Sequence, residues 1–502
     1  MSLKRNILAS FASQIYVTLV GVLILPMYLK YMGAEAYGLV GFFTMLQVFF
    51  NLLDMGLSPT VARETARFRG GATDALTYRR LLRALQVIFF AVAGAGGGTL
   101  FMFSGLIATK WINVQTLPFA QVKLALQLIA ISVALRWVSG LYRGCISGSE
   151  RLVWLGGFNA FVATLRFIGV IPVLIWIGNS PAVFFTYQLI VAVIELVGLA
   201  LRAHSLAPAV LPGQKIGWLP ALVFLSIKPV LKFSLTIAFT SAVWVLVTQL
   251  DKLVLSKLLP LADYGYFTLA VLAASGVLLI SGPISNALMP RMARLQAEGD
   301  DAGLITLYRN ATQLVAVIAI PACLILAFFS EQVLWLWTSN AQATAKASSV
   351  LRLYALGNGL LALAAFPYYL QFAKGDLRLH SIGSALFVVL LVPAIILGTL
   401  EYGVVGAGWA WLGANLVYFL VWVPKVHARF LHGLHMHWLR HDIGVIALPT
   451  AIVAAIAYSL IKWSYQRTSI AIDIAVVSLL LMIVAAAGAS LVRKSVYDRW
   501  VT

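Results

Sequence analysis

The fold is decided by residues 25–67, which read LPMYLKYMGAEAYGLVGFFTMLQVFFNLLDMGLSPTVARETAR. The stretch joins the end of one apolar run to a second run, near residues 37–60, and then passes into closely spaced arginines. A helix needs about 20 apolar residues to cross the hydrocarbon core of a bilayer. Runs of this length recur from one end of the chain to the other, so the chain is organised in membrane spans.

The composition of the whole chain excludes a soluble protein. Of 502 residues, 61% are apolar and 11% are charged, and the mean hydropathy is +0.94. A soluble chain carries about 25% charged residues. About 14 spans of about 22 residues each leave under roughly 200 residues for all loops. No soluble catalytic domain fits into that remainder, so we expect a protein that is not an enzyme and needs no cofactor.

The apolar runs predict an all-α polytopic membrane protein with about 14 transmembrane helices. Residues Ile7–Leu29 form the first run, which follows MSLKR and lacks a small-residue cleavage site, so we expect an uncleaved span. The other spans are expected near residues 37–60, 82–107, 121–145, 152–177, 181–203, 229–255, 264–289, 309–330, 350–373, 378–400, 404–425, 443–463 and 470–492.

The basic residues set the expected orientation. The formal net charge is +19, from 36 Lys plus Arg against 17 Asp plus Glu. If the N-terminus is cytoplasmic, 25 of the 36 basic residues fall at the termini and in cytoplasmic loops, and nine fall in outer loops. Lys and Arg accumulate in cytoplasmic loops, so this asymmetry predicts both termini inside and explains the charge without a nucleic acid partner. Only Arg136 and Arg166 remain, and both lie inside predicted spans.

An internal repeat appears when the chain is compared with itself at an offset of 227 residues. Tyr37 and Gly38 then meet Tyr264 and Gly265, and further polar and glycine matches fall at loop edges. The repeated unit contains six spans, an even number, so both copies have the same orientation. The sequence therefore predicts two six-helix lobes in a parallel pseudo-two-fold repeat plus two C-terminal helices. The expected parts are an N-terminal lobe at 1–215, a C-terminal lobe at 216–426, and a basic, histidine-rich linker with the last two helices at 427–502.

Arg166 and Arg136 are the charges that a membrane tolerates least. Arg166 lies about 14 residues into its span, which is roughly 21 Å along a helix. Arg136 lies about nine residues from the cytoplasmic end of its span, and Arg143 follows seven residues later near the same face. A charge at the bilayer centre costs at least about 2.5 kcal/mol, so two retained arginines indicate a use. They either bind an anion or pair structurally with Glu195 in the sixth span.

The repeat favours the anion site over the structural pair. A parallel duplication of bundles is a recurrent plan of transporters, whose lobes expose a cleft to each side in turn. The three intramembrane charges have no counterpart in the second copy, where the matching positions are Leu363, Pro393 and Trp422. Residues that build a fold tend to recur in both copies, whereas the site of an asymmetric substrate need not.

The expected substrate-binding residues are therefore Arg136 and Arg166, and Trp137 beside Arg136 is a candidate platform for stacking a sugar. Interfacial belts explain most Trp and Tyr residues more simply. Neighbouring helix positions point about 100° apart, so Asp251 and Lys252 are expected to neutralise different neighbours. The candidate gate or ion-coupling residues are Glu195, Asp251, Lys252 and Asp54.

Five of the seven histidines lie between His427 and His441. The pairs His432 with His435 and His437 with His441 have the helical spacing of metal ligands. No cysteine or suitably placed carboxylate accompanies them, except Asp442. We therefore expect no metal, and we interpret the stretch as a basic interfacial linker.

Four segments resemble a known family. They are LPMYLKYMGAEAYGLVGFFTMLQVFFNLLDMGLSPTVARETAR at 25–67, LDKLVLSKLLPLADYGYFTLA at 250–270, FPYYLQFAKGDLRLH at 366–380 and EYGVVGAGWAWLGANLVYF at 401–419. They are similar to Wzx-type polysaccharide flippases, within the multidrug/oligosaccharidyl-lipid/polysaccharide exporter superfamily. The resemblance implies transport of an undecaprenyl-diphosphate-linked oligosaccharide, for O-antigen or exopolysaccharide synthesis, from the cytoplasmic to the periplasmic leaflet of a bacterial inner membrane. It also implies a cationic cavity, contact with membrane lipids, and a polysaccharide polymerase and chain-length regulator as partners.

Other functions remain open at this point. A lipid II flippase has a similar fold and cargo. A multidrug cation antiporter of the same superfamily is expected to have an acidic site, and intramembrane arginines count against it. A membrane glycosyltransferase or polymerase needs a long outer loop, and every expected outer loop is short.

Overall fold

A computed structural model describes residues 3–54, 56–209, 242, 245–279, 281–461 and 466–490. Within these ranges the chain is nearly all helical and contains no β-strand, only one isolated bridge between Asn113 and Pro260. The predicted all-α class is confirmed. The chain divides into two compact units, Met1–Gly265 and Tyr266–Thr502. The predicted lobe boundary at residue 215 lies outside the described residues.

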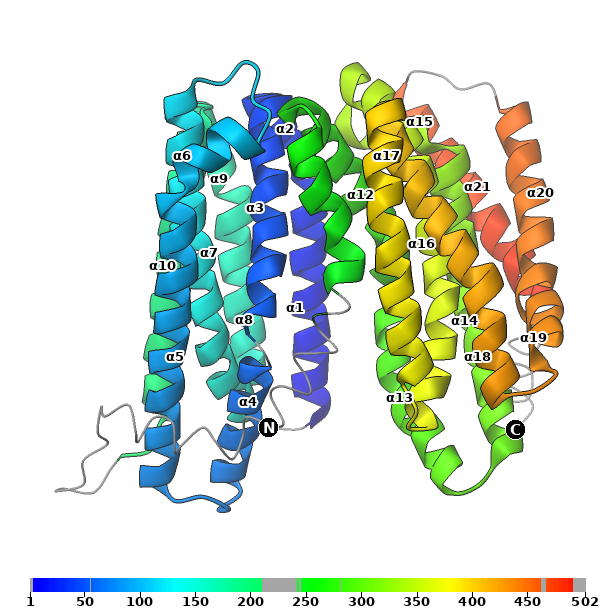
Figure 1. Cartoon of the computed structure of the whole chain (residues 1–502), viewed down its shortest axis with the longest axis horizontal. Helices are drawn as coiled ribbons and strands as arrows, with labels where there is room; N and C mark the ends of the chain where they lie inside the picture. Colours follow the sequence, from blue (N-terminus) through cyan, green and yellow to red (C-terminus); the bar gives the residue numbers. More distant parts are fainter. Residues whose placement is uncertain are drawn as a thin grey trace. The chain divides into compact units, whose positions relative to one another are not determined.

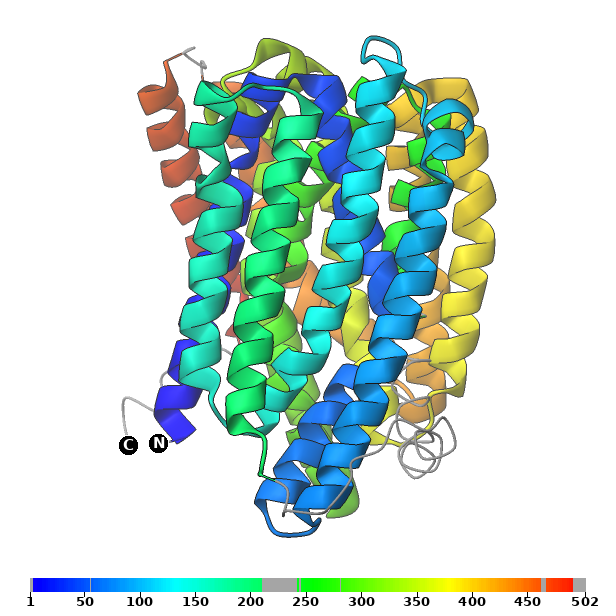
Figure 2. The same cartoon turned by 90° about the vertical axis from the view of Figure 1, so that its left-hand side faces the viewer.

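Unit 1 is a bundle of long apolar helices (Figures 1 and 2). Capping side chains fix the first turns of two helices. Asp74 accepts a hydrogen bond from the backbone N–H of Thr77 (3.0 Å) at the start of α5, and Ser180 accepts one from Val183 (3.3 Å) at the start of α10. The elements are α1 (Leu3–Leu23), α2 (Leu25–Met32), α3 (Ala34–Leu52), α4 (Leu57–Arg69), α5 (Ala75–Met102), α6 (Ser104–Leu106), η1 (Ile107–Trp111), α7 (Phe119–Gly148), α8 (Leu152–Ala163), η2 (Thr164–Ile168), α9 (Val170–Trp176) and α10 (Pro181–Leu206).

Helix α7 contacts α3, α4, α5 and α10. Its glycines at 140, 144 and 148 form a small-residue stripe against α4. A Cβ atom would lie 2.7 Å from the carbonyl oxygen of Ser58 if added to Gly144, and 2.2 Å from that of Ala62 if added to Gly148. Such stripes let membrane helices approach closely. The close approach fixes α7, and therefore the arginines it carries, within unit 1.

Unit 2 contains the remaining helices, and α12 (Leu261–Leu279) begins in unit 1 and continues into unit 2. Helix α17 is a hairpin of two helices, since Gly403 has φ 59° and ψ −142°. The other elements are α13 (Ser281–Ala297), α14 (Asp301–Phe328), α15 (Ser330–Thr338), α16 (Ala341–Ala373), α17 (Arg378–Val417), η3 (Tyr418–Trp422), α18 (Val423–Phe430), α19 (Leu434–His437), η4 (Trp438–Gly444), α20 (Val445–Leu460) and α21 (Arg467–Gly488).

Eleven helices of the described part are long and apolar enough to cross a membrane, or twelve if α3 and α4, bent by 54°, form one span. Besides the bend between α3 and α4, two further causes make this count smaller than the 14 spans predicted from the sequence. The segment Arg378–Phe430, which is counted once, holds two predicted spans on either side of Gly403. The predicted span at 229–255 lies largely outside the described residues, although residues 245–258 are helical.

The sequence repeat produces a symmetric helix crossing within unit 1. A Cβ atom on Gly38 of α3 would lie 2.2 Å from the carbonyl oxygen of Leu261, and one on Gly265 of α12 would lie 2.6 Å from that of Ala34. Gly38 and Gly265 are related by the offset of 227, and so are Ala34 and Leu261. The two close contacts therefore involve residues at equivalent positions of the sequence repeat.

The histidine-rich stretch is partly buried in unit 2, while His432, His437 and His441 are exposed. His427 is fully buried, and its Nε2 lies 2.7 Å from the hydroxyl of Tyr308 on α14. Asp442, also buried, accepts hydrogen bonds from the guanidinium of Arg309 at 2.7 and 3.0 Å. These contacts attach the residues that lead into α20 to unit 2. Among the described residues, no three His, Cys, Asp or Glu side chains gather closely enough to hold a metal ion.

Candidate functional site

Arg166 lies on η2, a π-helical turn between α8 and α9. The backbone N–H of Gly169 donates to the carbonyl of Thr164 at 2.9 Å, five residues earlier. Single π-turns inside α-helices occur often at functional sites. A Cβ atom on Gly169 would lie 2.3 Å from the hydroxyl oxygen of Tyr187, so glycine at this position allows Tyr187 to approach the turn.

Side chains from other helices satisfy the carbonyl groups of this turn. The carbonyl oxygens of Leu165, Arg166 and Phe167 accept hydrogen bonds from Tyr187 (3.0 Å), Gln188 (2.9 Å) and Tyr28 (2.9 Å), respectively. Buried backbone carbonyls without partners are costly, particularly in a membrane. The three side chains thus stabilise the π-turn and fix the backbone that carries Arg166.

The guanidinium groups of Arg166 and Arg136 contact amides and share one aromatic ring, and Arg166 also lies over the ring of Phe167 at 5.1 Å. Arg166 donates to the side-chain carbonyl of Gln47 at 2.9 Å, and Arg136 donates to that of Gln188 at 3.0 Å. The ring centroid of Phe43 lies 5.9 Å from Cζ of Arg166 and 5.2 Å from Cζ of Arg136. Both distances are within cation–π range. These neutral partners orient the two guanidinium groups and leave their positive charge in place.

Glu195 of α10 pairs with a third arginine, Arg143, two turns beyond Arg136 on α7. The Glu195 side chain is 6% exposed and that of Arg143 is 39% exposed. The structural pairing of Glu195 with Arg136 or Arg166, considered from sequence, is therefore not the ion pair that forms. The arginines outnumber the carboxylate at this place by three to one.

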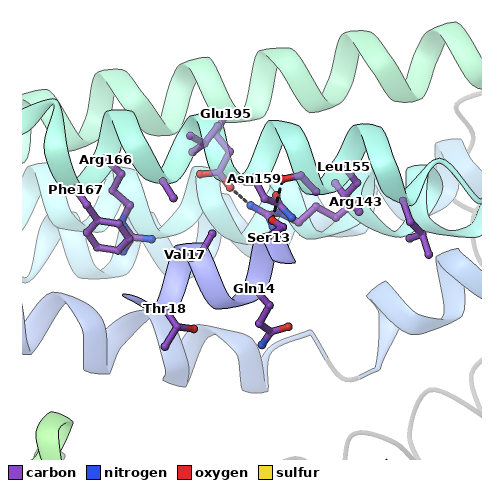
Figure 3. A pocket seen from close by; sticks show the side chains of 14 residues that line it. Ser13, Gln14, Val17, Thr18, Arg143, Leu155, Asn159, Arg166, Phe167 and Glu195 are labelled. Carbon is purple, nitrogen blue, oxygen red and sulfur yellow. Dashed lines mark hydrogen bonds and ion pairs between the residues drawn. The ribbon is translucent and has the colours of Figure 1, made fainter. Parts of the chain in front are cut away.

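Arg143, Arg166 and Glu195 line a cavity of about 340 Å³ within unit 1. Figure 3 shows these side chains on the helices that face Ser13 of α1. Arg136 does not line the cavity, and its Nε and Nη1 are buried without hydrogen-bond partners among the described residues. The other lining residues are Ser13, Gln14, Val17, Thr18, Leu152, Leu155, Gly156, Asn159, Val162, Ala163 and Phe167. The cavity therefore combines net positive charge with amide, hydroxyl and apolar groups.

Trp137 and Asp54 lie away from this cavity. Trp137 is 5% exposed and its ring stacks on Phe89 at 4.5 Å between centroids, so it offers little surface to a sugar. Asp54 accepts hydrogen bonds from the backbone N–H (3.1 Å) and the hydroxyl (2.6 Å) of Ser58. These bonds stabilise the first turn of α4, which gives Asp54 a local structural role in this conformation.

Asp251 and Lys252 pair with each other, contrary to the expectation that each would neutralise a different neighbour. Nζ of Lys252 lies 3.2 Å from Oδ1 of Asp251 and donates to the carbonyl of Thr248 at 2.8 Å. Asp251 is 1% exposed. Neither residue lines the cavity that holds Arg166.

Sequence reasoning missed Arg143, Gln47, Gln188, Tyr28 and Tyr187 as members of the site. The seven-residue spacing of Arg143 from Arg136 puts both on one face of a helix, but Arg143 lies at the cytoplasmic end of the predicted span at 121–145. The glutamines were visible as polar residues within apolar runs. No local signal marks the two tyrosines, because their partners are carbonyl groups on another helix.

Two family models each match more than half of the chain. That of the polysaccharide biosynthesis protein family matches residues 3–296, and that of the lipid II flippase MurJ matches residues 157–484. No curated protein matches the chain by sequence.

Solved structures share the fold at low sequence identity. The lipid II flippase MurJ in an inward closed conformation is 15% identical, with a TM-score of 0.70 over 97% of this chain and 98% of that chain. An inward-facing multidrug resistance transporter of the MATE family is 14% identical, with a TM-score of 0.63 over 85% of this chain and 99% of that chain. A transporter of the MOP superfamily from Pyrococcus furiosus is 14% identical, with a TM-score of 0.53 over 84% of this chain and 94% of that chain.

Proposed function

The chain belongs to the superfamily of membrane flippases and transporters that contains the polysaccharide biosynthesis proteins and the lipid II flippase MurJ, and from this membership we propose its cargo. It moves an undecaprenyl-diphosphate-linked oligosaccharide from the cytoplasmic to the periplasmic leaflet of the bacterial inner membrane, by alternating access and with both termini in the cytoplasm. A polysaccharide polymerase and a chain-length regulator would act on the product.

The observation that carries this proposal is the cationic cavity around Arg166. Arg143 and Arg166 line it, Arg136 lies beside it, and Glu195 is the one carboxylate among the lining residues. Guanidinium groups form paired hydrogen bonds with phosphate oxygens, each worth about 1.5–3 kcal/mol. A diphosphate in the cavity would meet fixed positive charge, while the polyprenyl tail stays in lipid.

Direction follows from charge. Sugars cannot cross hydrocarbon unassisted because their hydroxyl groups would lose their hydrogen bonds. An inside-negative membrane potential favours outward movement of an anion by about 2.3 kcal/mol per charge per 100 mV. A substrate with two negative charges therefore gains free energy on export.

A lipid II flippase is the second candidate, since the MurJ model matches 328 residues at 157–484 and the MurJ structure covers 97% of the chain. Its cargo also carries a diphosphate, so the same cavity would serve. A multidrug cation antiporter is disfavoured because two arginines and one carboxylate line the cavity and a third arginine, Arg136, lies beside it.

The proposal is tested by replacing Arg166 in cells or vesicles supplied with the lipid-linked glycan. We expect Arg166→Ala to abolish appearance of glycan on the outer face at normal protein level, because the diphosphate loses a deep cationic partner. Arg202→Ala is the matched control, since Arg202 also lies over an aromatic ring, that of Trp154 at 5.4 Å, but does not line the cavity. Parent-level transport by Arg166→Ala would contradict the proposed site.

A further inference from the structure

Arg143 forms an ion pair with the buried carboxylate of Glu195, and both residues line the cavity. Only 6% of the Glu195 side chain is exposed, against 39% of the Arg143 side chain. A ligand phosphate in the cavity and the Glu195 carboxylate would therefore compete for the same positive charge.

This competition leaves Glu195 with a weakened counter-charge when an anion is bound. A buried carboxylate without a paired cation is unfavourable, and the usual response is to take up a proton and become neutral. Arginine remains charged in proteins and cannot give up its proton to relieve the site. A proton from water on the carboxylate of Glu195 is the available compensation.

The surroundings of Glu195 support this assignment. The charged groups that face the carboxylate are Arg143 and Arg136 of α7 and Arg166 of η2. From α8 and α1, the polar residues that line the cavity with it are Asn159, Ser13 and Gln14, none of which titrates. The positive charges of these three arginines favour the ionised carboxylate. An anion that engages them reduces this effect and favours the protonated form.

We infer that binding of the anionic substrate and uptake of one proton by Glu195 are coupled. The inference rests on the proposed function, because it takes a diphosphate as the ligand of the cavity. When the substrate binds, its phosphate oxygens replace the carboxylate on Arg143 and a proton passes from water to Glu195. When the substrate leaves, Arg143 pairs again with Glu195 and the proton returns to water.

The coupling is measured on the purified full-length protein in detergent, with a short-chain prenyl-diphospho-sugar as the probe. This probe is a diphosphate diester, so its phosphates stay ionised over the pH range used. Calorimetric titration in buffers of different ionisation enthalpy counts the protons taken up. We expect about one proton per bound probe, and an affinity that rises up to about tenfold for each pH unit lowered.

Variants of Glu195 separate the coupling from binding. Glu195→Gln should bind the probe without proton uptake and with an affinity independent of pH. Glu195→Asp keeps a carboxylate and should retain proton uptake. If the glutamine variant does not fold, the aspartate variant is measured in its place. Glu64→Gln is the matched control, because Glu64 is a buried carboxylate paired with Arg67 at 3.2 Å that does not line the cavity. It should behave like the parent.

The failures of the two proposals are distinguishable. If the parent protein binds the probe, Arg166→Ala weakens that binding and no proton is taken up, the coupling is overturned and the proposed function stands. Uptake that persists in Glu195→Gln also overturns the assignment to Glu195. If the parent protein does not bind the probe at all, the diphosphate site itself is wrong, and the coupling fails with it.

Discussion

Gln188 connects Arg136 and Arg166 through its two amide atoms. Its side-chain carbonyl accepts from Arg136 at 3.0 Å, and its side-chain N–H donates to the backbone carbonyl of Arg166 at 2.9 Å. Gln188 is 2% exposed. One buried amide therefore orients a guanidinium on α7 and the backbone of η2 together. A carboxylate at this position would neutralise Arg136, whereas an amide orients it and preserves its charge.

This role predicts that one substitution lowers stability and that another lowers transport while the fold is kept. We expect Gln188→Leu to destabilise the protein, because each buried polar group left without its partner costs about 1–3 kcal/mol. Gln188→Glu should keep the fold, since its carboxylate pairs with Arg136, but should lower transport by removing positive charge from the site. Thermal unfolding in detergent and glycan export measure the two effects. Undiminished export by Gln188→Glu would show that the charge of Arg136 is not needed.

At the scale of the element, the π-turn η2 is stable only because three side chains from two other helices supply its hydrogen-bond partners. Tyr28 of α2 and Tyr187 and Gln188 of α10 bind its carbonyl groups. The extra residue in the turn changes the direction of the side chains that follow. The position of Arg166 in the cavity is thus a property of the turn as much as of the residue.

Gly169→Ala is expected to disturb this turn and to lower transport without a comparable loss of folded protein. The added Cβ atom would lie 2.3 Å from the hydroxyl oxygen of Tyr187 and 2.6 Å from the carbonyl oxygen of Leu165, so Tyr187 must move away. Gly157→Ala on the neighbouring α8 is the control, because no atom lies within 4 Å of its added Cβ. Export and protein level are measured side by side. Equal export by both variants would mean that the geometry of the turn does not matter.

For the whole molecule, the sequence predicts the helices far better than it predicts the contacts between them. Long apolar runs suffice to predict spans, and a charge inside such a run is conspicuous, which is why Arg166 and Arg136 could be identified. Arg143 was missed because it lies near the end of a predicted span. The partner of Trp137 is Phe89, on a different helix, so a pattern along one helix could not reveal the stack.

The internal repeat aligns two glycines, Gly38 and Gly265, that also lie against each other in the structure. Gly38 and Gly265 lie where α3 crosses the start of α12, and each would place a Cβ atom within 2.6 Å of a backbone carbonyl of the opposite copy. A methyl group at either position forces the same two helices apart. Either substitution alone should therefore cause most of the loss of stability that the two cause together.

Gly38→Ala and Gly265→Ala should each lower stability by about 1–3 kcal/mol, as expected for overpacking at a close contact. The double variant should lose little more than either single variant, since the first methyl group already opens the crossing and residues in contact are not additive. Thermal unfolding in detergent of the parent, the two single variants and the double variant gives the double-mutant cycle. Gly276→Ala on α12 is the control, because its added Cβ meets nothing within 4 Å. Fully additive losses would show that the two glycines act at separate contacts, so that the repeat would not build one symmetric crossing.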